Sequence, residues 1–489
     1  MGNNSQLGPE RCFMKIDIIV PDPSRRWHSL LLERLTADGH ILSIAPASSL
    51  NWPVTMRAAL TLERRIIHRG DLSQSVRIAS VPPAGPADLA IDLVGTTKTD
   101  MPTLRIAFDG SFDDAAVITA LAAGELPDLD IVLDGRSFDS ASPMVDNRTF
   151  IAAAADDVFA RAITLVRHAI SRYAAGDRAS APLVSRARNG LFPARYLASA
   201  LPRIAREAMR RRTYHFAHWR VGYRLLDGPG VAETGELGNG WSVLPDDGSR
   251  FYADPFPFEH EGRRYIFVED YPHATRKAVI SVAALDEQGV AGTPAPVLEE
   301  PHHLSYPQVF ARDGEIWMLP EASASHKLTL YRAEPFPHRW VPAATLLEGD
   351  VSDATLLDHD GRFWLLATDR DGDIGSTSDT LVAFHALTLT GPWTPHRRNP
   401  ILIDRRRARP GGAAVAANGK LLLPIQDGTE GYGAGLGLSE IIRLDTDEVV
   451  LGDPQLVSGR GDFPYRQVHT LNRAGRLEVI DGIAAVRRR

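Results

Sequence analysis

The sequence lacks several features that would place it in particular classes of protein. Its single cysteine, Cys12, excludes an intrachain disulfide and a cysteine-rich zinc site. No apolar run reaches the length of about 18 residues that a transmembrane helix needs, and the first residues show no signal-peptide pattern. Acidic residues exceed basic residues and give a formal charge of −7, which disfavours nucleic acid as a partner. We therefore expect a cytoplasmic protein that does not bind nucleic acid.

The first third of the chain alternates strand-like and helix-like patterns. Residues 1–13 are expected to form a disordered leader. Apolar, β-branched runs then predict five strands, and a long helix is predicted over about 148–174. This alternation favours a Rossmann-like α/β domain with a parallel sheet over 14–176. The predicted strands are 15–20, 40–45, 88–94, 104–108 and 129–133.

Residues 177–213 are predicted to form a linker with a basic helix. Within it, Ser185–Arg212 holds eight arginines and one acid, Glu207, beside several apolar residues. That composition is typical of a helix that lies on anionic lipid headgroups, and it predicts peripheral contact with the inner face of a membrane. The alternative is a helix that only connects two domains, with its arginines in solvent.

Five segments of the last 280 residues share one layout: an apolar strand, a polar turn that ends in glycine, and a second apolar strand. Glycine adopts the positive φ of a tight hairpin turn without steric cost. Further strand-like pieces lie between the hairpins, so five repeats of four strands predict a five-bladed β-propeller over 214–489. Residues 215–226 would supply the strand that closes the ring. The turn glycines are Gly262, Gly314, Gly361, Gly419 and Gly475, at intervals of 47 to 58 residues.

The repeats also predict where a ligand site lies, because the innermost strands of all blades converge on the central channel. Counting eight residues back from each turn glycine gives the start of each inner strand, and counting seven forward gives the end of the second strand. The first set is Asp254, Tyr306, Asp353, Gly411 and Gln467, and the nearby Arg409 and His469 are expected to lie at the same end of the channel. The second set is Glu269, Glu321, Thr368, Gln426 and Gly482.

These positions place several carboxylates around one polar pocket, as sugar chemistry requires. One carboxyl group protonates the leaving oxygen while another activates water or an acceptor hydroxyl. The alternative for each single acid is structural, since aspartates at blade ends also cap turns and tie blades together. The predicted catalytic residues are Asp254, Asp353, Glu321 and Glu269. The predicted substrate-binding residues are Tyr306, Arg409, Gln426, Tyr432, Gln467 and His469, the tyrosines by stacking on sugar rings.

Neither a cofactor nor a metal is predicted. The turn after the first predicted strand, PDPSRR, lacks the G-x-G-x-x-G fingerprint of a dinucleotide site. The segment Asp369–Gly375 matches a calcium loop only in part, because Thr380 stands where that loop needs glutamate. His469 is expected to be a hydrogen-bonded core histidine rather than a metal ligand.

An ordered series of motifs resembles one known propeller domain. The series includes ADPFPF…YIFVED, LSYPQVF…GEIWMLPEAS, RPGGAAV and IQDGTEGYGAGL, and the resemblance covers about residues 214–485. It is similar to the domain at the N-terminus of plant glucosamine inositolphosphorylceramide transferases, which also occurs in bacterial proteins, and we expect a bacterial protein of that kind. In the plant enzymes a separate C-terminal domain is the glycosyltransferase, and no such domain is expected here.

The same segments are more distantly similar to five-bladed glycoside hydrolases that cleave arabinan and fructan. That resemblance implies an acid at the start of the first blade, which Asp254 matches, and carboxylates on the next inner strands. Here the second blade offers Tyr306 and the third offers Asp353, so Glu269 or Glu321 would act from an adjoining strand. The N-terminal domain is faintly similar to formyltransferase domains but lacks their catalytic Asn–His–Asp set.

Together these features predict a sugar-processing protein of cell-surface glycan or glycolipid assembly. A glycosyl unit bound in the propeller funnel would be transferred or hydrolysed, so the expected partner is a carbohydrate or glycolipid. Two alternatives stay open. One is a non-catalytic glycan-binding or scaffold protein, and the other is group transfer to a sugar by the N-terminal domain.

Overall fold

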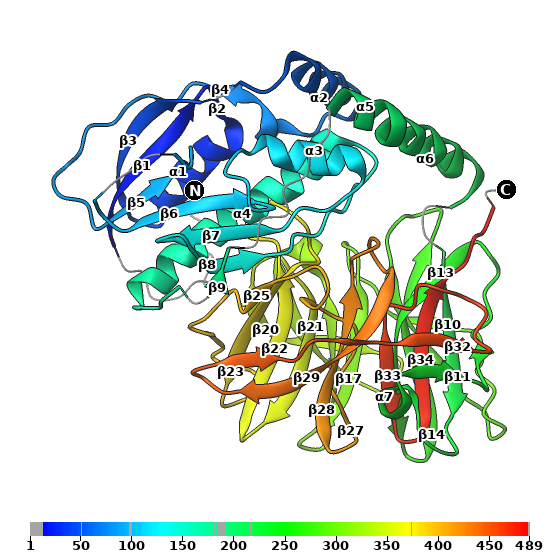
Figure 1. Cartoon of the computed structure of the whole chain (residues 1–489). Coiled ribbons are helices and arrows are strands. Elements are labelled where there is room, and N and C mark those ends of the chain that lie inside the picture. The colour runs from blue at the N-terminus through cyan, green and yellow to red at the C-terminus, as the bar shows by residue number, and fades with distance from the viewer. Residues whose placement is uncertain are drawn as a thin grey trace. The chain divides into compact units, whose positions relative to one another are not determined.

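The computed structural model describes residues 13–49, 51–96, 100–179, 181–183, 192–215, 218–372 and 374–487. Most of the expected leader, Cys12 and the start of the arginine-rich segment therefore lie outside the described residues. The chain divides into two compact units (Figure 1). One comprises Pro9–Arg210 with Asp373–Ser376, and the other comprises the rest of the chain.

The N-terminal unit contains a seven-stranded mixed sheet. Its first four strands run parallel, whereas the last three are antiparallel, so it is not the fully parallel sheet that the sequence predicted. One cause is the Asp134-Gly135 turn, where both residues have positive φ and join two strands as a tight hairpin. In sheet order the strands are β3 (Ile41–Ser48), β1 (Lys15–Asp22), β5 (Leu89–Asp92), β6 (Thr103–Phe108), β7 (Leu129–Leu133), β8 (Arg136–Ala141) and β9 (Ala181–Pro182).

Aromatic packing joins the helices of this unit to its sheet. Trp27 of α1 (Arg26–Ala37) stacks on Phe159 of α4 (Ile151–Ala174) at 5.5 Å between ring centroids, and Phe108 of β6 meets both rings edge-on. All three side chains are fully buried. Two further helices are α2 (Val54–Ile67) and α3 (Ala115–Ala123).

A continuous helical run ends the N-terminal unit. It comprises α5 (Phe192–Arg195), a π-helical stretch η2 (Tyr196–Ala200) and α6 (Leu201–Thr213). The π-helical stretch lies directly before Pro202, which removes one backbone donor from the helix. Within the described residues, no helix combines the length and the apolar character needed to cross a bilayer. The cytoplasmic location predicted from the sequence stays a prediction.

The second unit is a five-bladed β-propeller, as the repeats predict. Each blade is a sheet built on four antiparallel strands. The first blade is β13 (Arg250–His260), β14 (Arg263–Pro272), β15 (Val279–Ala284) and β16 (Ala295–Leu298). The second is β17 (Ser305–Arg312), β18 (Glu315–Glu321), β19 (Lys327–Ala333) and β20 (Trp340–Glu348). The third is β21 (Val351–His359), β22 (Arg362–Asp369), β23 (Thr380–Ala386) and β24 (Thr394–Pro395), with β25 (Leu402–Ile403) beside β23. The fourth is β26 (Arg409–Pro410), β28 (Lys420–Asp427), β29 (Gly435–Leu444) and β30 (Val449–Leu451), with β27 (Val415–Ala417) and β31 (Gln455–Leu456) at its edges.

The fifth blade closes the ring with strands from both ends of the unit. Its inner strands β33 (Leu471–Ala474) and β34 (Leu477–Ile483) are C-terminal, and its outer strands β10 (Trp219–Leu225) and β12 (Ser242–Val243) precede the first blade. β10 pairs with β34 along its whole length, from Trp219 opposite Ile483 to Leu225 opposite Leu477. The predicted closing strand at 215–226 is therefore confirmed.

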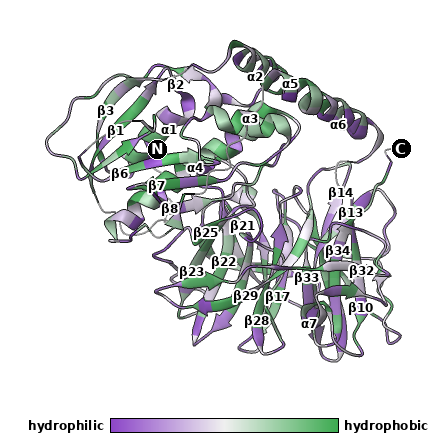
Figure 2. Cartoon of the chain, viewed as in Figure 1, coloured by the Kyte–Doolittle hydropathy of each residue, from purple (hydrophilic) through white to green (hydrophobic). Residues whose placement is uncertain are grey.

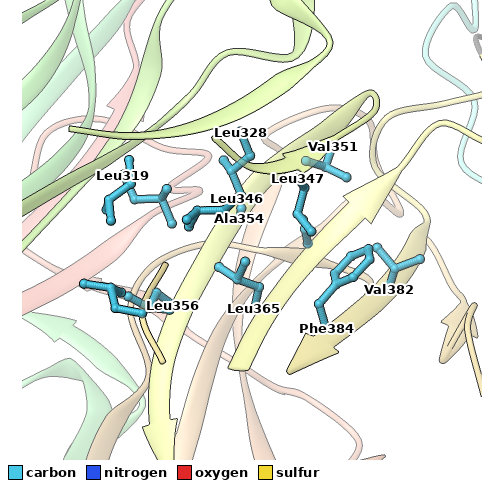
Figure 3. Close-up of a cluster of buried hydrophobic side chains, with 13 residues drawn as sticks. Leu319, Leu328, Leu346, Leu347, Val351, Ala354, Leu356, Leu365, Val382 and Phe384 are labelled. Carbon is cyan, nitrogen blue, oxygen red and sulfur yellow. The ribbon is translucent and has the colours of Figure 1, made fainter. Parts of the chain in front are cut away.

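Apolar side chains fill the space between neighbouring blades. Figure 3 shows one such cluster, in which Leu319 and Leu328 of the second blade meet Leu356, Leu365 and Phe384 of the third. Alternate residues of each strand supply these contacts, because side chains along a strand point to opposite faces. The blades also share polar contacts: the Gln308 amide exchanges two hydrogen bonds with the backbone of Leu356. Both kinds of contact keep the inner strands in fixed positions around the channel.

The closing blade contains a buried ion pair whose loss should be measurable. Arg224 of β10 donates two hydrogen bonds, of 2.9 and 2.6 Å, to Glu478 of β34, which also accepts from the Val231 amide. Arg224→Met leaves a buried carboxylate unpaired and should lower the free energy of unfolding by about 3–5 kcal/mol in urea titration. Lys420→Ala, which breaks an exposed pair with Glu440, is the control and should cost about 0–1 kcal/mol. Equal effects of the two substitutions would contradict a role for Arg224 in closure.

Candidate functional site

The candidate site is built on an unusual backbone feature that repeats around the propeller. Asp254, Tyr306, Asp353 and Gln467 all have a left-handed backbone, with φ of +47°, +47°, +49° and +60°. In the first three blades this residue lies where the register between the inner strand and its neighbour shifts, as at a β-bulge. Such a conformation costs about 1–3 kcal/mol for a residue with a side chain, and away from turns it is typical of functional sites.

The fourth blade carries glycine at the corresponding place. A Cβ atom on Gly411 would lie 2.6 Å from the carbonyl oxygen of His469, and one on Gly412 would lie 2.0 Å from that of Leu471. Only glycine permits this close approach of the fourth blade to the fifth. The other four blades carry a residue with a side chain at this position, and in the first three blades that side chain is buried.

Asp353 is the most tightly held of these side chains. It is almost fully buried, and its Oδ2 accepts hydrogen bonds of 2.6 Å from both Arg409 Nε and Gln426 Nε2. Arg409 is itself fixed by Thr377 and Ser378. The three residues come from the third and fourth blades and are in direct contact, and their predicted roles in catalysis and binding stay predictions.

Asp254 belongs to a second buried group. His469 lies between two carboxylates: its Nδ1 is 2.7 Å from Asp481 Oδ1, and its Nε2 is 3.3 Å from Asp254 Oδ1. Asp481 also accepts from the backbone amides of Asp254 and Thr470. Trp219 of the closing strand stacks on the imidazole at 3.9 Å between ring centroids. His469 is thus a buried, hydrogen-bonded histidine, as the sequence predicted.

Burial and neighbouring charge act together on the two central aspartates. Burial raises the pKa of Asp254 well above its usual value, and the carboxylates of Glu269, Asp353 and Asp481 raise it further. Burial also raises the pKa of Asp353, but there the Arg409 guanidinium opposes the change. Asp254 therefore keeps its proton to higher pH than an exposed aspartate, whereas Asp353 has a cation to stabilise its ionised form.

One oxygen of each aspartate has no hydrogen-bond partner among the described residues. These are Asp254 Oδ1 and Asp353 Oδ1, and both atoms are buried. A buried carboxylate oxygen without a partner costs free energy unless a ligand or water satisfies it. Asp254 Oδ1 nevertheless lies 3.3 Å from His469 Nε2, so a change of protonation at either group would give it a partner.

Both predicted glutamates lie on the second strands of their blades, Glu269 within β14 and Glu321 at the end of β18. Glu269 is largely buried, with Oε1 3.2 Å from His303 Nε2. Glu321 accepts hydrogen bonds from the hydroxyls of Ser305, at 3.0 Å, and Ser323, at 2.7 Å. Their charges act on the central aspartates, Glu269 on Asp254 and Glu321 on Asp353.

The predicted aromatic residues have different surroundings. Tyr306 is fully buried, and its hydroxyl hydrogen bonds to Thr355 at 2.8 Å, so the ring is unavailable for stacking on a sugar. Tyr432 is 44% exposed, and the Arg409 guanidinium carbon lies 5.2 Å from its ring centroid. The side chain of Gln467 is exposed, and only its backbone matches the other blades. Tyr432 is thus the better candidate for sugar stacking, and the prediction of stacking by Tyr306 is wrong.

Sequence reasoning underestimated Asp481 and missed Trp219. Asp481 was visible as an acid beside the seventh position after a turn glycine, but its hydrogen bonds to His469 become evident only when the ring is closed. The ligand atoms of Asp254, His469 and Asp481 also lie within 4.8 Å of one another, a spacing that a metal ion could use. The prediction that no metal binds remains untested.

Comparison with known proteins identifies one related family. Residues 244–452 match the family described as glucosamine inositolphosphorylceramide transferase 1, N-terminal. The curated protein of that name from Arabidopsis thaliana is 34% identical over 203 residues, which are 41% of this chain and 26% of the relative. The protein from Oryza sativa subsp. japonica is 32% identical over 247 residues, 48% of this chain and 33% of the relative. The chain thus spans about a quarter to a third of the length of these relatives.

Solved structures with a related arrangement are distant in sequence. An α-L-arabinanase from Cellvibrio cellulosa is 18% identical, with a TM-score of 0.33, over 43% of this chain and 80% of that one. The catalytic domain of an α-L-arabinofuranosidase from Coprinopsis cinerea is 13% identical, with a TM-score of 0.36, over 48% of this chain and 92% of that one. The family match lies within the propeller, so the formyltransferase-like resemblance of the N-terminal unit stays a prediction.

The ion pair at the centre predicts a pH effect on stability. Arg409→Met should raise the pKa of Asp353 further, because it removes the cation that opposes burial. A carboxyl group with a raised pKa in the folded state contributes stability that is complete below its unfolded pKa of about 4 and is lost as pH rises through the folded pKa. The thermal midpoint of Arg409→Met should therefore fall more steeply than that of the wild type between about pH 5 and pH 8. Adding Asp353→Asn should remove this extra slope, and an unchanged slope in Arg409→Met would refute the assignment.

Proposed function

We propose that the propeller is a sugar-processing site, in which a glycosyl unit binds at the channel between Asp254 and Asp353. The observation that carries the proposal is the pair of buried aspartates, each on a left-handed bulge and each with one buried oxygen that accepts no hydrogen bond from the described residues. Acid–base chemistry at a glycosidic bond uses two carboxyl groups of unequal proton affinity. The different surroundings of the two aspartates supply that inequality.

Asp254 is proposed as the general acid. Its raised pKa keeps it protonated at a pH where an exposed aspartate is ionised, so it can give a proton to a leaving oxygen. Asp353, held by Arg409 and Gln426, is proposed as the ionised partner that accepts a proton from water or from an acceptor hydroxyl. Glu321 and Glu269 support the pair by their charge.

His469 and Asp481 are proposed to position the acid. If the Nδ1–H of a neutral imidazole donates to Asp481, then Nε2 is left as an acceptor 3.3 Å from Asp254 Oδ1. In the free protein a protonated Asp254 can donate through Oδ1 to that nitrogen, and the same proton is the one given to the leaving oxygen once a substrate is bound. The stacked Trp219 ring keeps the imidazole in its plane.

The substrate class is proposed from the related family. The relatives' name includes transfer to an inositolphosphorylceramide, so a carbohydrate or a glycolipid is the ligand class to test first. Tyr432, exposed above Arg409, offers an aromatic face for a sugar ring. Whether the glycosyl unit is transferred or hydrolysed depends on whether an acceptor hydroxyl or water occupies the place beside Asp353.

A non-catalytic glycan-binding protein is the second candidate, and the tight contacts of Asp353 favour it. An aspartate that accepts two short hydrogen bonds from Arg409 and Gln426 is also what a structural tie between blades needs. In that case the same channel would recognise a glycan and present it to a partner enzyme. Substitution of Asp254 separates the two candidates.

Asp254→Asn keeps the shape of the side chain and removes its proton transfer, and asparagine tolerates the left-handed backbone. Asp360→Asn is the matched control, because Asp360 also has a left-handed backbone, with φ of +50°, on an exposed hairpin turn.

On a substrate found by screening the full chain with nucleotide sugars and short glycans, Asp254→Asn should lower kcat by about 10²- to 10⁴-fold with little change in binding. Wild-type activity should also fall as pH rises through the pKa of Asp254. Unchanged turnover in Asp254→Asn would remove the acid role, and binding without any turnover in the wild type would favour the second candidate.

Tyr432→Ala tests the sugar-stacking surface separately from the chemistry. Loss of an aromatic contact of about 0.5–1.5 kcal/mol should weaken glycan binding by about 2- to 12-fold in calorimetry, whereas Tyr432→Phe should bind nearly as the wild type. If both variants bind equally well, the ring does not contact the sugar.

A further inference from the structure

Two helices of the N-terminal unit expose apolar side chains at a regular spacing. On α2 these are Val54, Ala58, Leu62 and Ile66, and on η2 and α6 they are Leu197, Leu201, Ala205 and Met209. Each series repeats every four residues, which places its members along one side of a helix. The six large side chains are 43% to 70% exposed. No residue of α6 is buried, although a water-soluble helix usually covers its apolar side.

Arginines flank both apolar series. Arg57, Arg65 and Arg69 are exposed on or just after α2, and Arg206 is exposed on α6. The acids of α2 and α6 are Glu63, which is buried, and Glu207, which pairs with Arg210. Figure 2 shows hydrophilic and hydrophobic residues side by side along α6. The surface is thus both apolar and cationic, in a chain whose formal charge is −7.

Hydrogen bonds join the two helices to each other and to the rest of the unit. The hydroxyl of Tyr196, in η2, donates to Glu63 Oε1 of α2 at 3.0 Å, and Glu63 Oε2 accepts from the amide of Ala152 at the start of α4. Arg203 of α6 donates to the carbonyl of Leu121 in α3. Figure 1 shows α2, α5 and α6 following one another along the N-terminal unit. These contacts fix both apolar series on the same body.

We propose that α2 and the η2–α6 helix together form a docking surface for an anionic lipid bilayer. The sequence predicted membrane contact through 185–212 alone, and the structure adds α2 as a second, parallel contribution. Exposed aliphatic side chains between arginines suit a headgroup region, where the guanidinium groups meet lipid phosphates and the apolar residues enter the acyl boundary. A nucleic acid would use the arginines but would gain nothing from six exposed aliphatic side chains. The proposal goes beyond the sugar site and does not depend on it.

The experiment is flotation of the full chain with vesicles of phosphatidylcholine containing 30% phosphatidylglycerol, and with phosphatidylcholine vesicles alone, at low and physiological salt. We expect binding to the anionic vesicles that weakens as salt rises, and at least tenfold less binding to the neutral ones. No binding to anionic vesicles even at low salt would overturn the proposal.

Two variants separate the contributions of charge and apolar contact. The charge variant changes Arg57, Arg65, Arg69 and Arg206 to Gln, and the apolar variant changes Leu62, Ile66, Leu201 and Met209 to Ser. Each should reduce vesicle affinity by about a hundredfold or more, since each basic residue near the surface contributes substantially. The control changes four exposed arginines of the propeller to Gln, namely Arg263, Arg339, Arg397 and Arg460, and should bind as the wild type. Loss of binding in the control would show a non-specific charge effect and overturn the proposal.

Insertion can be measured directly because the sequence has one cysteine. In a Cys12→Ser background, Leu201→Cys labelled with an environment-sensitive fluorophore should shift to the blue and brighten on anionic vesicles, whereas a label at Asp360→Cys should not change. An apolar variant that binds vesicles like the wild type, or a label at position 201 that stays in water, would overturn the proposal. The proposal would also be overturned if light scattering showed the wild type as a dimer and the apolar variant as a monomer, and the wild type did not bind vesicles. The surface would then join two copies of the chain.

Discussion

The pairing of β10 with β34 is the constraint on which the propeller depends. A ring of blades has no edge only when the first and last strands of the unit meet in one sheet, and here Trp219–Leu225 lies antiparallel to Leu477–Ile483. The Arg224–Glu478 pair holds that junction from within. Closure also brings Trp219 over His469 and Asp481 beside Asp254. The stability of the ring and the assembly of the site thus have the same cause.

Closure also makes it possible to keep four inner-strand residues in a strained backbone. Each left-handed residue favours unfolding on its own, yet the apolar packing between blades and the hydrogen bonds around Asp353 and Asp481 hold all of them. Of the four side chains, Asp254 and Asp353 lie near enough for the charge of Asp353 to raise the pKa of Asp254, whereas Tyr306 is buried in the core and Gln467 is exposed. The carboxyl groups of Asp254, Asp353 and Asp481 are therefore buried together with the His469 imidazole and the Arg409 guanidinium, and solvent screens such buried charges only weakly.

The sequence predicted the propeller well because its signals are local and repeated. A strand, a glycine turn and a second strand recur five times, and counting from the glycines located Asp254, Tyr306 and Asp353. The direction of each side chain could not be predicted in this way. Tyr306 turns its ring into the core, and Asp353 is bound by residues 56 and 73 positions away. The mixed sheet of the N-terminal unit was missed in part because the Asp134-Gly135 hairpin between β7 and β8 was not recognised, and the antiparallel pairing of β7 with β6 is a second departure from the predicted parallel sheet.

Because the fifth blade is made of strands from both ends of the propeller, it decides which residues must be kept together when the propeller is expressed alone or exchanged between proteins. The family match covers 244–452, whereas the closing blade is made of β12, β10, β34 and β33, which lie outside that range. A fragment cut at the family limits would leave β13 and the fourth blade without their neighbour, and the exposed flanks would favour aggregation. Insertions in related proteins are therefore expected in the loops between blades, and any exchange of this propeller between proteins must carry its first and last strands together.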